Sequence, residues 1–373
     1  MTLATLDDRT PPRPVGAAHL TREQIDELGR ELDALRAEVM DSLGAEDARY
    51  IHGMIQTQRM LEVAGRLLLV GARRPLAFAA GTGMLAVAKI LENMEIGHNV
   101  IHGQWDWMRD PDIHSTSWEW DFVAPAKGWK HTHNDVHHTW TNVVGKDRDV
   151  GYSVLRVSRE QEWEPRFLFN LPMNALIAPL FEWAIAIYDL ELDEVKAGRK
   201  SKGALRDDFK ALGVKVARMI AKDYAGTPLV AHLATRSGVQ ALVGALLANT
   251  IRNVWAHAVI FCGHFPDEVE SFPEEAIEGE TRGDWYVRQM LGSANLQGGR
   301  LFHIMTGNLS HQIEHHLFPD MPSRRYGQIA PRVREICERY GLKYTSGPLH
   351  RQIRQTWRTL ARLSLPDRLA VSR

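Results

Sequence analysis

The sequence predicts an all-α protein built as a helical bundle in a membrane. Three long apolar segments, residues 75–91, 167–190 and 239–262, have the composition of helices buried in lipid. Apolar residues between positions 25 and 39 recur every three or four residues, which is the period of an amphipathic helix. Histidines recur at i and i+4, a spacing that brings two side chains to one face of a helix.

Composition excludes several other classes of protein. The chain has 373 residues, enough for one or two domains, and its net charge of −1 argues against a nucleic-acid partner. Its two cysteines, Cys262 and Cys337, are too few for a disulfide framework or a four-thiolate iron–sulfur site. The mean hydropathy of −0.28 resembles that of a soluble protein. We attribute it to polar side chains inside the bundle, Asn253 and His257 among them.

Residues 1–50 are expected to form a soluble N-terminal segment. The first residues, MTLATLDDRT, have neither a basic nor an apolar region, so we expect no cleaved signal peptide. Thr21 and Gln24 fit a capping box at the start of a helix. An apolar stripe at helical spacing follows it, made of Ile25, Leu28, Leu32, Leu35 and Val39.

The next segments are predicted to be a helical hairpin and a cavity-lining region. Residues 54–72 and 75–97 can pair across a turn at Arg73, Arg74 and Pro75. Residues 98–160 hold two histidine clusters, many tryptophans and many charges, so they should line a cavity near the surface.

The charged segment 191–223 leaves two topologies open. Its lysines and arginines place it in the cytoplasm by the positive-inside rule. If 167–190 crosses the membrane once, this segment lies opposite the first two histidine clusters. We favour the alternative, in which 167–190 lies on or dips into the membrane and 226–262 forms a two-pass hairpin, because all clusters then share one side. The chain after residue 323 is basic and helical in pattern and is predicted to be soluble.

Three histidine clusters indicate a site for more than one metal ion. They are His98-x3-His102, His133-x3-His137-His138 and His311-x3-His315-His316. On a helix the next residue is rotated by about 100°, so His138 and His316 could reach a second ion. Zinc is disfavoured because a zinc site saturates at four ligands, whereas the clusters offer eight imidazoles. Copper–thiolate chemistry is disfavoured because no cysteine adjoins a cluster. Two iron ions with an open edge for dioxygen account best for eight imidazoles.

Other redox motifs are missing from the sequence. Carboxylate-rich di-iron proteins need two Glu-x-x-His motifs, and the chain has one, Glu95-x2-His98. Gly81-x-Gly83 lies in an apolar segment without a preceding strand, so it is not a dinucleotide-binding motif. Because no iron–sulfur, flavin or fused cytochrome motif occurs, electrons for oxygen chemistry must come from a separate protein.

The histidine motifs resemble those of membrane fatty acid desaturases, most closely the actinobacterial acyl-CoA and acyl-lipid desaturases. The matching stretches are GHNVIHGQWDWM (97–108), WKHTHNDVHHTWTN (129–142) and HQIEHHLFPDMP (311–322). The resemblance covers roughly residues 50–345 and is highly specific. It implies an integral membrane bundle of about four spans under a cytoplasmic helical cap. It also implies a di-iron centre that uses O2 to insert a cis double bond into an acyl-CoA or acyl-lipid.

Carried over by position, the resemblance implies iron ligands in all three boxes and in the last span. The family often takes one histidine from that span, and His257 fits its Asn-x3-His arrangement better than His264 on the same stripe. Some relatives replace the first histidine of the third box by glutamine, which leaves His311 and Gln312 as alternatives. The implied ligands are His98, His102, His133, His137, His138, His257, His311, His315 and His316.

The remaining polar and aromatic residues near the boxes are expected to support the site. His303 is a minor ligand candidate, whereas His131 is expected to be a supporting or surface imidazole. Carboxylates close enough to hold the second N–H of a ligating histidine are Glu95, Asp106, Asp135, Asp147, Asp149 and Glu314. Tryptophans that could wall an acyl channel, or pack at the membrane interface, are Trp105, Trp107, Trp118, Trp120 and Trp129. Isolated histidines expected to be ordinary are His19, His52, His114, His232 and His350.

The implied enzyme lies in the bacterial plasma membrane with its active site toward the cytoplasm. Its electrons would come from a ferredoxin or an NAD(P)H-dependent reductase. The expected division is an N-terminal segment (1–50), a membrane desaturase domain (51–345) and a basic cytoplasmic tail (346–373). Two alternatives remain: a fatty acyl or alkane hydroxylase of the same superfamily, and a histidine-rich membrane protein that binds metal without catalysis.

Overall fold

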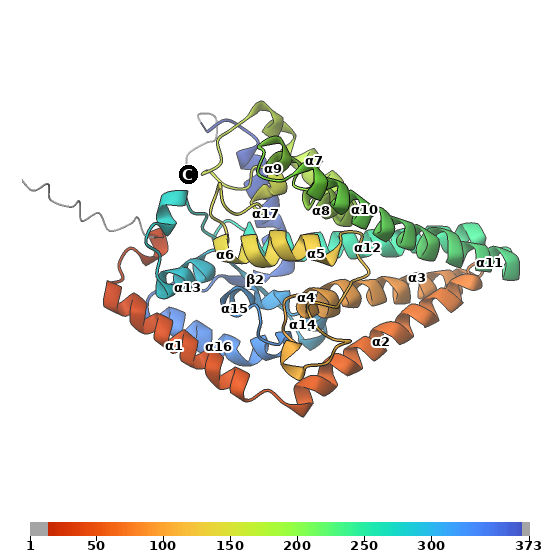
Figure 1. Ribbon diagram of the computed structural model, residues 1–373, viewed down its shortest axis with the longest axis horizontal. Helices are drawn as coiled ribbons and strands as arrows, with labels where there is room; N and C mark the ends of the chain where they lie inside the picture. Colours follow the sequence, from red (N-terminus) through yellow and green to blue (C-terminus); the bar gives the residue numbers. More distant parts are fainter. Residues whose placement is uncertain (1–13, 368–373) are drawn as a thin grey trace, which may run out of the picture.

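The structure, a computed structural model, describes residues 14–367. In this range the regular secondary structure is helical apart from one pair of short parallel strands, β1 (Asn295–Gln297) and β2 (Ser346–Pro348), and an isolated bridge between Val143 and Phe272. Figure 1 shows a long arm that narrows to a tip, made of α2, α3, α11 and α12, and a broader body that holds α1, α13, α15 and α16. The predicted all-α class is confirmed.

Helix α1 (Arg22–Asp41) lies on the outside of the body. The backbone amide of Gln24 donates to Thr21 Oγ1, and the amide of Thr21 donates to Gln24 Oε1, so the predicted capping box is present. The predicted apolar stripe is buried. It packs against α13 (Arg282–Leu291), and with α16 (Tyr326–Arg339) these helices share one hydrophobic core.

Helices α2 (Ala45–Val70) and α3 (Pro75–Ile90) form the first hairpin of the arm. Pro75 opens α3, where its missing N–H costs nothing. Two glycines let the helices touch. A Cβ on Gly65 would lie 2.9 Å from the backbone N of Leu85, and one on Gly81 would lie 3.0 Å from the carbonyl oxygen of Gly65. The predicted hairpin is confirmed.

A second hairpin runs beside the first. Helix α10 (Lys202–Met219) continues through a π-helical segment, Ile220–Gly226, into α11 (Thr227–Thr235), and α12 (Gly238–His264) returns to the body. The hydroxyls of Thr235 and Ser237 both donate to the carbonyl oxygen of Val70, so the turns of the two hairpins meet at the tip. The predicted hairpin over 226–262 is therefore present, and α3 and α12 lie in contact.

The apolar segment 167–190 is divided into short helical pieces. These are Pro165–Phe169, α7 (Asn170–Ile177), Ala178–Leu180 and α8 (Phe181–Tyr188), followed by α9 (Leu192–Lys196). Among the residues described, two helical stretches are long and apolar enough to cross a membrane, Pro75–Ile101 and Pro165–Lys196. The expected number of about four membrane spans therefore stays a prediction.

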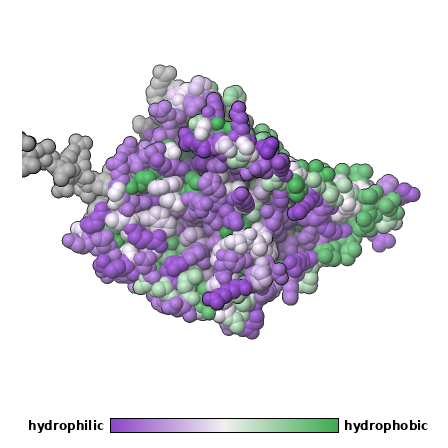
Figure 2. All heavy atoms as spheres, in the orientation of Figure 1, coloured by the Kyte–Doolittle hydropathy of each residue, from purple (hydrophilic) through white to green (hydrophobic). Residues whose placement is uncertain are grey.

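Exposed apolar side chains gather on the arm. Figure 2 shows many of them along the outer part of the arm, with hydrophilic residues at its very end, whereas the body is mostly hydrophilic on the same face. Leu67, Leu76, Leu233 and Val239 are each more than 60% exposed. Contiguous apolar surface of this kind marks contact with lipid or with another protein.

All but one of the remaining α-helices are short, and several of them carry the histidines. They are α4 (Asn99–Ile101), α5 (Ala126–Trp129), α6 (His138–Trp140), α14 (Arg300–Met305), α15 (Gln312–Leu317) and the longer α17 (Leu349–Leu363).

Candidate metal centre

The first two histidine motifs lie on helices that widen into π-helical turns. Leu91–His98 continues α3 into α4, and Lys130–His137 joins α5 to α6. The ring centroids of His98 and His102 are 4.6 Å apart, and those of His133 and His137 are 4.9 Å apart. The predicted pairing of imidazoles at i and i+4 is confirmed for both motifs. π-Helical turns are frequent at functional sites.

The third motif has the spacing of the second but a different geometry. Helix α15 begins at Gln312, and His311 precedes it with φ −102° and ψ 56°, so His311 is not on the helical face. Its ring stacks on that of His303 at 4.6 Å. His315 and His316, in contrast, are fully buried on α15.

Seven histidines form two groups whose nitrogens could hold metal ions. In the first group the candidate ligand atoms lie within 4.8 Å of one another and belong to His98, His102, His133 and His315. In the second group they belong to His137, His264 and His316. His138 lies between the groups, with its ring 4.7 Å from that of His102 and 4.5 Å from that of His316.

The structure does not bring His257 and His311 to either group. His257 lies on α12 seven residues before His264, about 10 Å back toward the tip. Its Nε2 is 3.0 Å from Asn174 Oδ1, and its ring stacks on Phe261. His264, at the body end of α12, takes the place expected for His257. Of the two histidines that the sequence offered on this stripe, the geometry therefore places His264, and not His257, in a histidine group.

Gln312 takes the place expected for His311. Its side-chain amide lies 3.0 Å from His264 Nε2, and its Oε1 is buried without a hydrogen-bond partner. Of the two alternatives left open by the sequence, the geometry favours the glutamine, because the first turn of α15 directs it into the centre.

The middle of the centre holds buried nitrogen atoms that no protein group satisfies. They are Nε2 of His102, His133, His137 and His315, and both ring nitrogens of His138. Leaving so many buried polar atoms unpaired would be costly in a purely structural cluster. A metal ion accepts one lone pair from each imidazole, so the donor set fits bound metal, and the two groups fit two ions.

The outer nitrogens of the same imidazoles are held by the surrounding protein. Asp147 Oδ2 lies 3.0 Å from His137 Nδ1, and Asp149 Oδ2 lies 3.3 Å from His133 Nδ1. Such contacts fix the ring orientation and make the inner nitrogen more basic. Asp147 and Asp149 are thus the two predicted carboxylates that support the histidines in the way expected.

The other predicted carboxylates contact different groups. Glu95 binds Tyr50, Asn308 and Ser323. Glu314 accepts hydrogen bonds from Tyr344 and Asn295 and is 3.9 Å from His311. Asp106 binds Ser115, and Asp135 lies beside the exposed His131.

Sequence reasoning missed the polar groups that hold the third box. Tyr326 Oη lies 3.2 Å from His315 Nδ1, and Gln289 Oε1 lies 3.1 Å from His316 Nδ1. Thr141 Oγ1 is also 3.1 Å from His316 Nδ1. Tyr326 and Gln289 stand outside every histidine motif, so no spacing could have indicated them.

Electrostatics in the centre keep most of the imidazoles neutral. Burial, with neighbouring imidazoles in second place, lowers the pKa of His102, His133, His138 and His315 well below the ordinary value. Desolvation acts in the same direction on His137, but the Asp147 and Asp149 carboxylates outweigh it and raise its pKa. Neutral imidazole is the form that binds metal.

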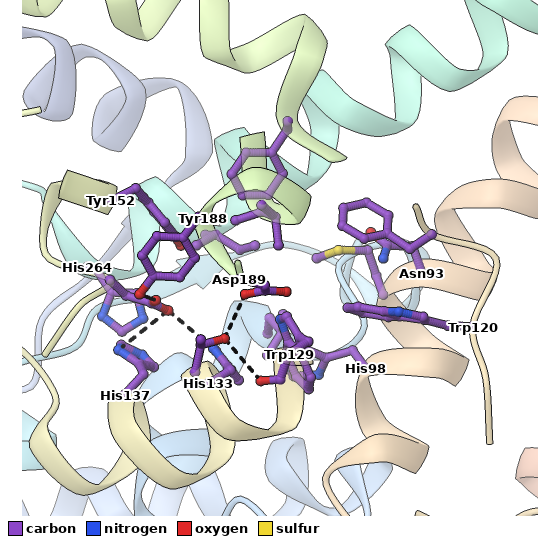
Figure 3. A pocket seen from close by; sticks show the side chains of 18 of the residues that line it. Asn93, His98, Trp120, Trp129, His133, His137, Tyr152, Tyr188, Asp189 and His264 are labelled. Atoms are coloured by element: carbon purple, nitrogen blue, oxygen red, sulfur yellow. Dashed lines mark hydrogen bonds and ion pairs between the residues drawn. The ribbon is translucent and has the colours of Figure 1, made fainter. Parts of the chain in front are cut away.

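An apolar cavity ends on both histidine groups. His98, His133, His137, His264 and Gln312 form one part of its wall. Figure 3 shows His133 and His137 on one helix below Tyr188 and Asp189, with Trp120 and Asn93 farther along the cavity. Other walls are apolar, from Met94, Phe122, Phe181, Ile185 and Ile260. Of the five predicted tryptophans, Trp120 and Trp129 line this cavity.

Known proteins resemble this chain over most of its length. A model of the fatty acid desaturase family matches residues 74–348. The chain is 51% identical over 352 residues to the NADPH-dependent stearoyl-CoA 9-desaturase of Mycobacterium tuberculosis. The aligned region covers 94% of this chain and 82% of the relative. It is 25% identical over 283 residues to the sn-1 linoleoyl-lipid 6-desaturase of Synechocystis, covering 72% of this chain and 75% of the relative.

A buried histidine-rich centre at the end of an apolar cavity has the donor atoms and the apolar walls that a metal-dependent oxidoreductase acting on hydrocarbon chains requires. With the family match over residues 74–348, the chain belongs to the fatty acid desaturase family. It is a fatty acid desaturase.

Proposed function

We propose that this enzyme desaturates stearoyl-CoA at carbon 9, with O2 as the co-substrate and two water molecules as the second product. The observation that carries the proposal is an apolar cavity that ends on two adjacent groups of buried imidazoles. The mycobacterial relative supports the substrate, because its name specifies stearoyl-CoA and position 9 and its identity extends over nearly the whole chain.

The proposed metal ions are two irons, one at each histidine group. The first iron would be held by His98, His102, His133 and His315, and the second by His137, His264 and His316. His138 lies beside both groups, and Gln312 lies beside the second. When bound, iron supplies the activation of O2 and the removal of two hydrogen atoms from the acyl chain. All-nitrogen imidazole sets suit iron better than magnesium or calcium, which prefer oxygen ligands.

The protein's own contribution is positioning and the exclusion of water. The rings are held from outside by Asp147, Asp149 and Tyr326, so their inner nitrogens point at a fixed place. The apolar walls would align two adjacent methylene groups of the chain with the centre, and pre-alignment of this kind lowers the barrier to reaction.

The reaction requires two electrons and two protons beyond those of the substrate. We propose that a separate, NADPH-linked donor supplies the electrons, either a reductase or a ferredoxin that a reductase serves. The printed name of the mycobacterial relative supports NADPH as the ultimate source.

We further propose that residues 51–345 form the membrane desaturase domain, with about four spans and its metal centre on the cytoplasmic side. The N-terminal segment 1–50 and the basic segment 346–373 would then belong to the cytoplasmic part. The apolar arm and the two apolar helical stretches support membrane insertion.

Reconstituted enzyme tests the proposal directly. Purified protein, loaded with iron and supplied with stearoyl-CoA, O2 and a reductase system, should release a product two mass units lighter with its double bond at carbon 9. A product one oxygen atom heavier would identify a hydroxylase. No turnover by an iron-loaded sample would favour metal binding without catalysis. Conversion of a stearoyl glycerolipid but not stearoyl-CoA would reassign the substrate.

A further inference from the structure

Helix α17 carries a cationic face that is open to solvent. Its arginines at positions 351, 354, 358 and 362 are all exposed and follow helical spacing, and the helix contains no acidic residue. In the part of the chain that the structure describes, the ion pairs of this stripe are both with Asp267, which lies 3.7 Å from Arg358 and from Arg362. One carboxylate therefore faces four guanidinium groups, and Arg351 and Arg354 keep their charge uncompensated.

The opposite face of α17 is buried and fixes the helix against α7. Leu360 shares a hydrophobic core with Ile177 of α7, and Asn170 Nδ2 donates a hydrogen bond to the carbonyl oxygen of Leu360. Trp163 Nε1 donates to the carbonyl oxygen of Ser364, directly after the helix. The same face also contacts α12, so α17 lies beside α7 on the body side of the arm (Figure 1).

The neighbourhood of α7 has the surface of a segment that meets lipid. Pro165–Lys196 is one of the two helical stretches that are long and apolar enough to cross a membrane. Phe169, Leu176 and Ile187 in this stretch are each more than half exposed. On α17, Trp357 is exposed among the arginines, and tryptophan is enriched at membrane–water interfaces. An apolar surface beside a cationic helix with an exposed tryptophan is typical of protein at the surface of an anionic membrane.

We propose that α17 lies at the membrane surface and binds the phosphate groups of anionic lipids. Guanidinium groups bind phosphate oxygens with paired, charge-assisted hydrogen bonds, and each of these arginines can offer several donors. The inference rests on the proposed membrane insertion of the arm and not on the choice of substrate. An acidic protein is the other partner that a cationic helix can take. The exposed apolar side chains beside α17 favour lipid, because they would stay in water under a polar protein surface.

The variant Arg351→Gln/Arg354→Gln/Arg358→Gln tests the lipid surface. The full chain in a neutral detergent is mixed with dioleoyl-phosphatidylglycerol or dioleoyl-phosphatidylcholine, and native mass spectrometry counts the bound lipid. The unaltered protein should bind phosphatidylglycerol at least about tenfold more tightly, since each cation near an anionic surface contributes about fivefold in affinity. High salt should weaken this preference, because it screens exposed charges. The glutamine variant should bind both lipids with similar affinity, whereas lysines at the same three positions should retain the preference.

The matched control is Arg30→Gln/Arg332→Gln/Arg339→Gln. It removes the same charge from the outer faces of α1 and α16, where each arginine is paired with a glutamate. This control should keep the preference for phosphatidylglycerol, and thermal melting should show that all variants are folded. A preference that survives in the α17 glutamine variant would overturn the lipid surface, and it is the result expected if the stripe serves an acidic protein. An equal loss in the control would also overturn it. Lipid counts do not depend on turnover, so failure of the proposed reaction would be seen separately, as absence of a desaturated product.

Discussion

Single residues at the centre show that equal spacing does not guarantee an equal role. His133 and His311 both open an H-x3-H-H motif, yet His133 joins the first histidine group and His311 stacks on His303 outside it. The difference arises in the backbone: His133 lies within a π-helical turn, whereas α15 starts one residue after His311. Whether a motif histidine can bind metal therefore depends on where its helix begins.

Replacing His264 with Ala should remove one ligand from the second histidine group. We expect a loss of about one iron per chain and a fall in turnover of more than about 100-fold, because even supporting residues of metal sites cost 10- to 100-fold. Elemental analysis and desaturation rates measure both effects. His257→Ala is the control. This variant should keep both irons, and its free energy of unfolding should fall by about 1–2 kcal/mol, because Asn174 loses its hydrogen-bond partner. Retention of both irons by His264→Ala would contradict the assignment.

The third box gives a second paired test. Gln312→Ala should lower turnover about 10- to 100-fold, because Gln312 lines the cavity and contacts His264. His311→Ala should retain most of the activity and the full iron content, since its ring lies against His303 at the surface of the centre. Steady-state rates on stearoyl-CoA distinguish the two variants. The reverse order of sensitivity would return His311 to the ligand set.

At the scale of elements, close helix packing in the arm positions the metal centre. His98 lies in the helical segment that continues α3, and His264 ends α12, so the contact of these two helices sets the distance between one histidine of each group. Polar side chains add to the packing within the arm. Asp223 binds both Lys89 and Arg66, at 2.6 and 2.7 Å, and all three are largely buried. Removing the charge of one residue in such a buried network is strongly destabilising, because it leaves its partner's charge buried without a counter-charge.

Gly65→Ala should destabilise the first hairpin. The new Cβ would meet the backbone of Leu85 at 2.9 Å, and overpacking of this kind costs about 1–3 kcal/mol. Thermal melting in detergent should show a lower transition temperature. Gly83→Ala, on α3 with no atom within 4 Å of the added Cβ, should melt at the same temperature or higher, because alanine favours helix. Equal effects of the two substitutions would refute the role given to the close contact.

At the scale of the whole molecule, the surface divides into an apolar arm and a hydrophilic body. Figure 1 and Figure 2 together place many exposed apolar side chains on the outer part of the arm, close to the tip where both hairpin turns meet. The histidine groups lie at the other end of α3 and α12, toward the body. A membrane that received the arm would thus leave the metal centre near its surface.

The intact protein should therefore behave as an integral membrane protein. We expect it to stay in the membrane pellet after an alkaline carbonate wash and to be released by detergent, because removing the exposed apolar surface of the arm from water is favourable. Fractionation followed by immunoblotting provides the measurement. Active monomer in a detergent-free, high-speed supernatant would contradict this.

The sequence by itself determined the helical class, the capped helix α1, both hairpins of the arm and most of the histidines that gather in the two groups. These features depend on local spacing, and a helix or an i, i+4 pair is defined by residues that lie close along the chain. Only the tertiary structure decided that His264 and Gln312 enter the centre while His257 and His311 stay outside. It also showed that Tyr326 and Gln289 hold the third box. The physical reason is that a metal centre is assembled from helices far apart in sequence, and the rotation and start of each helix follow from its packing, which no local pattern encodes.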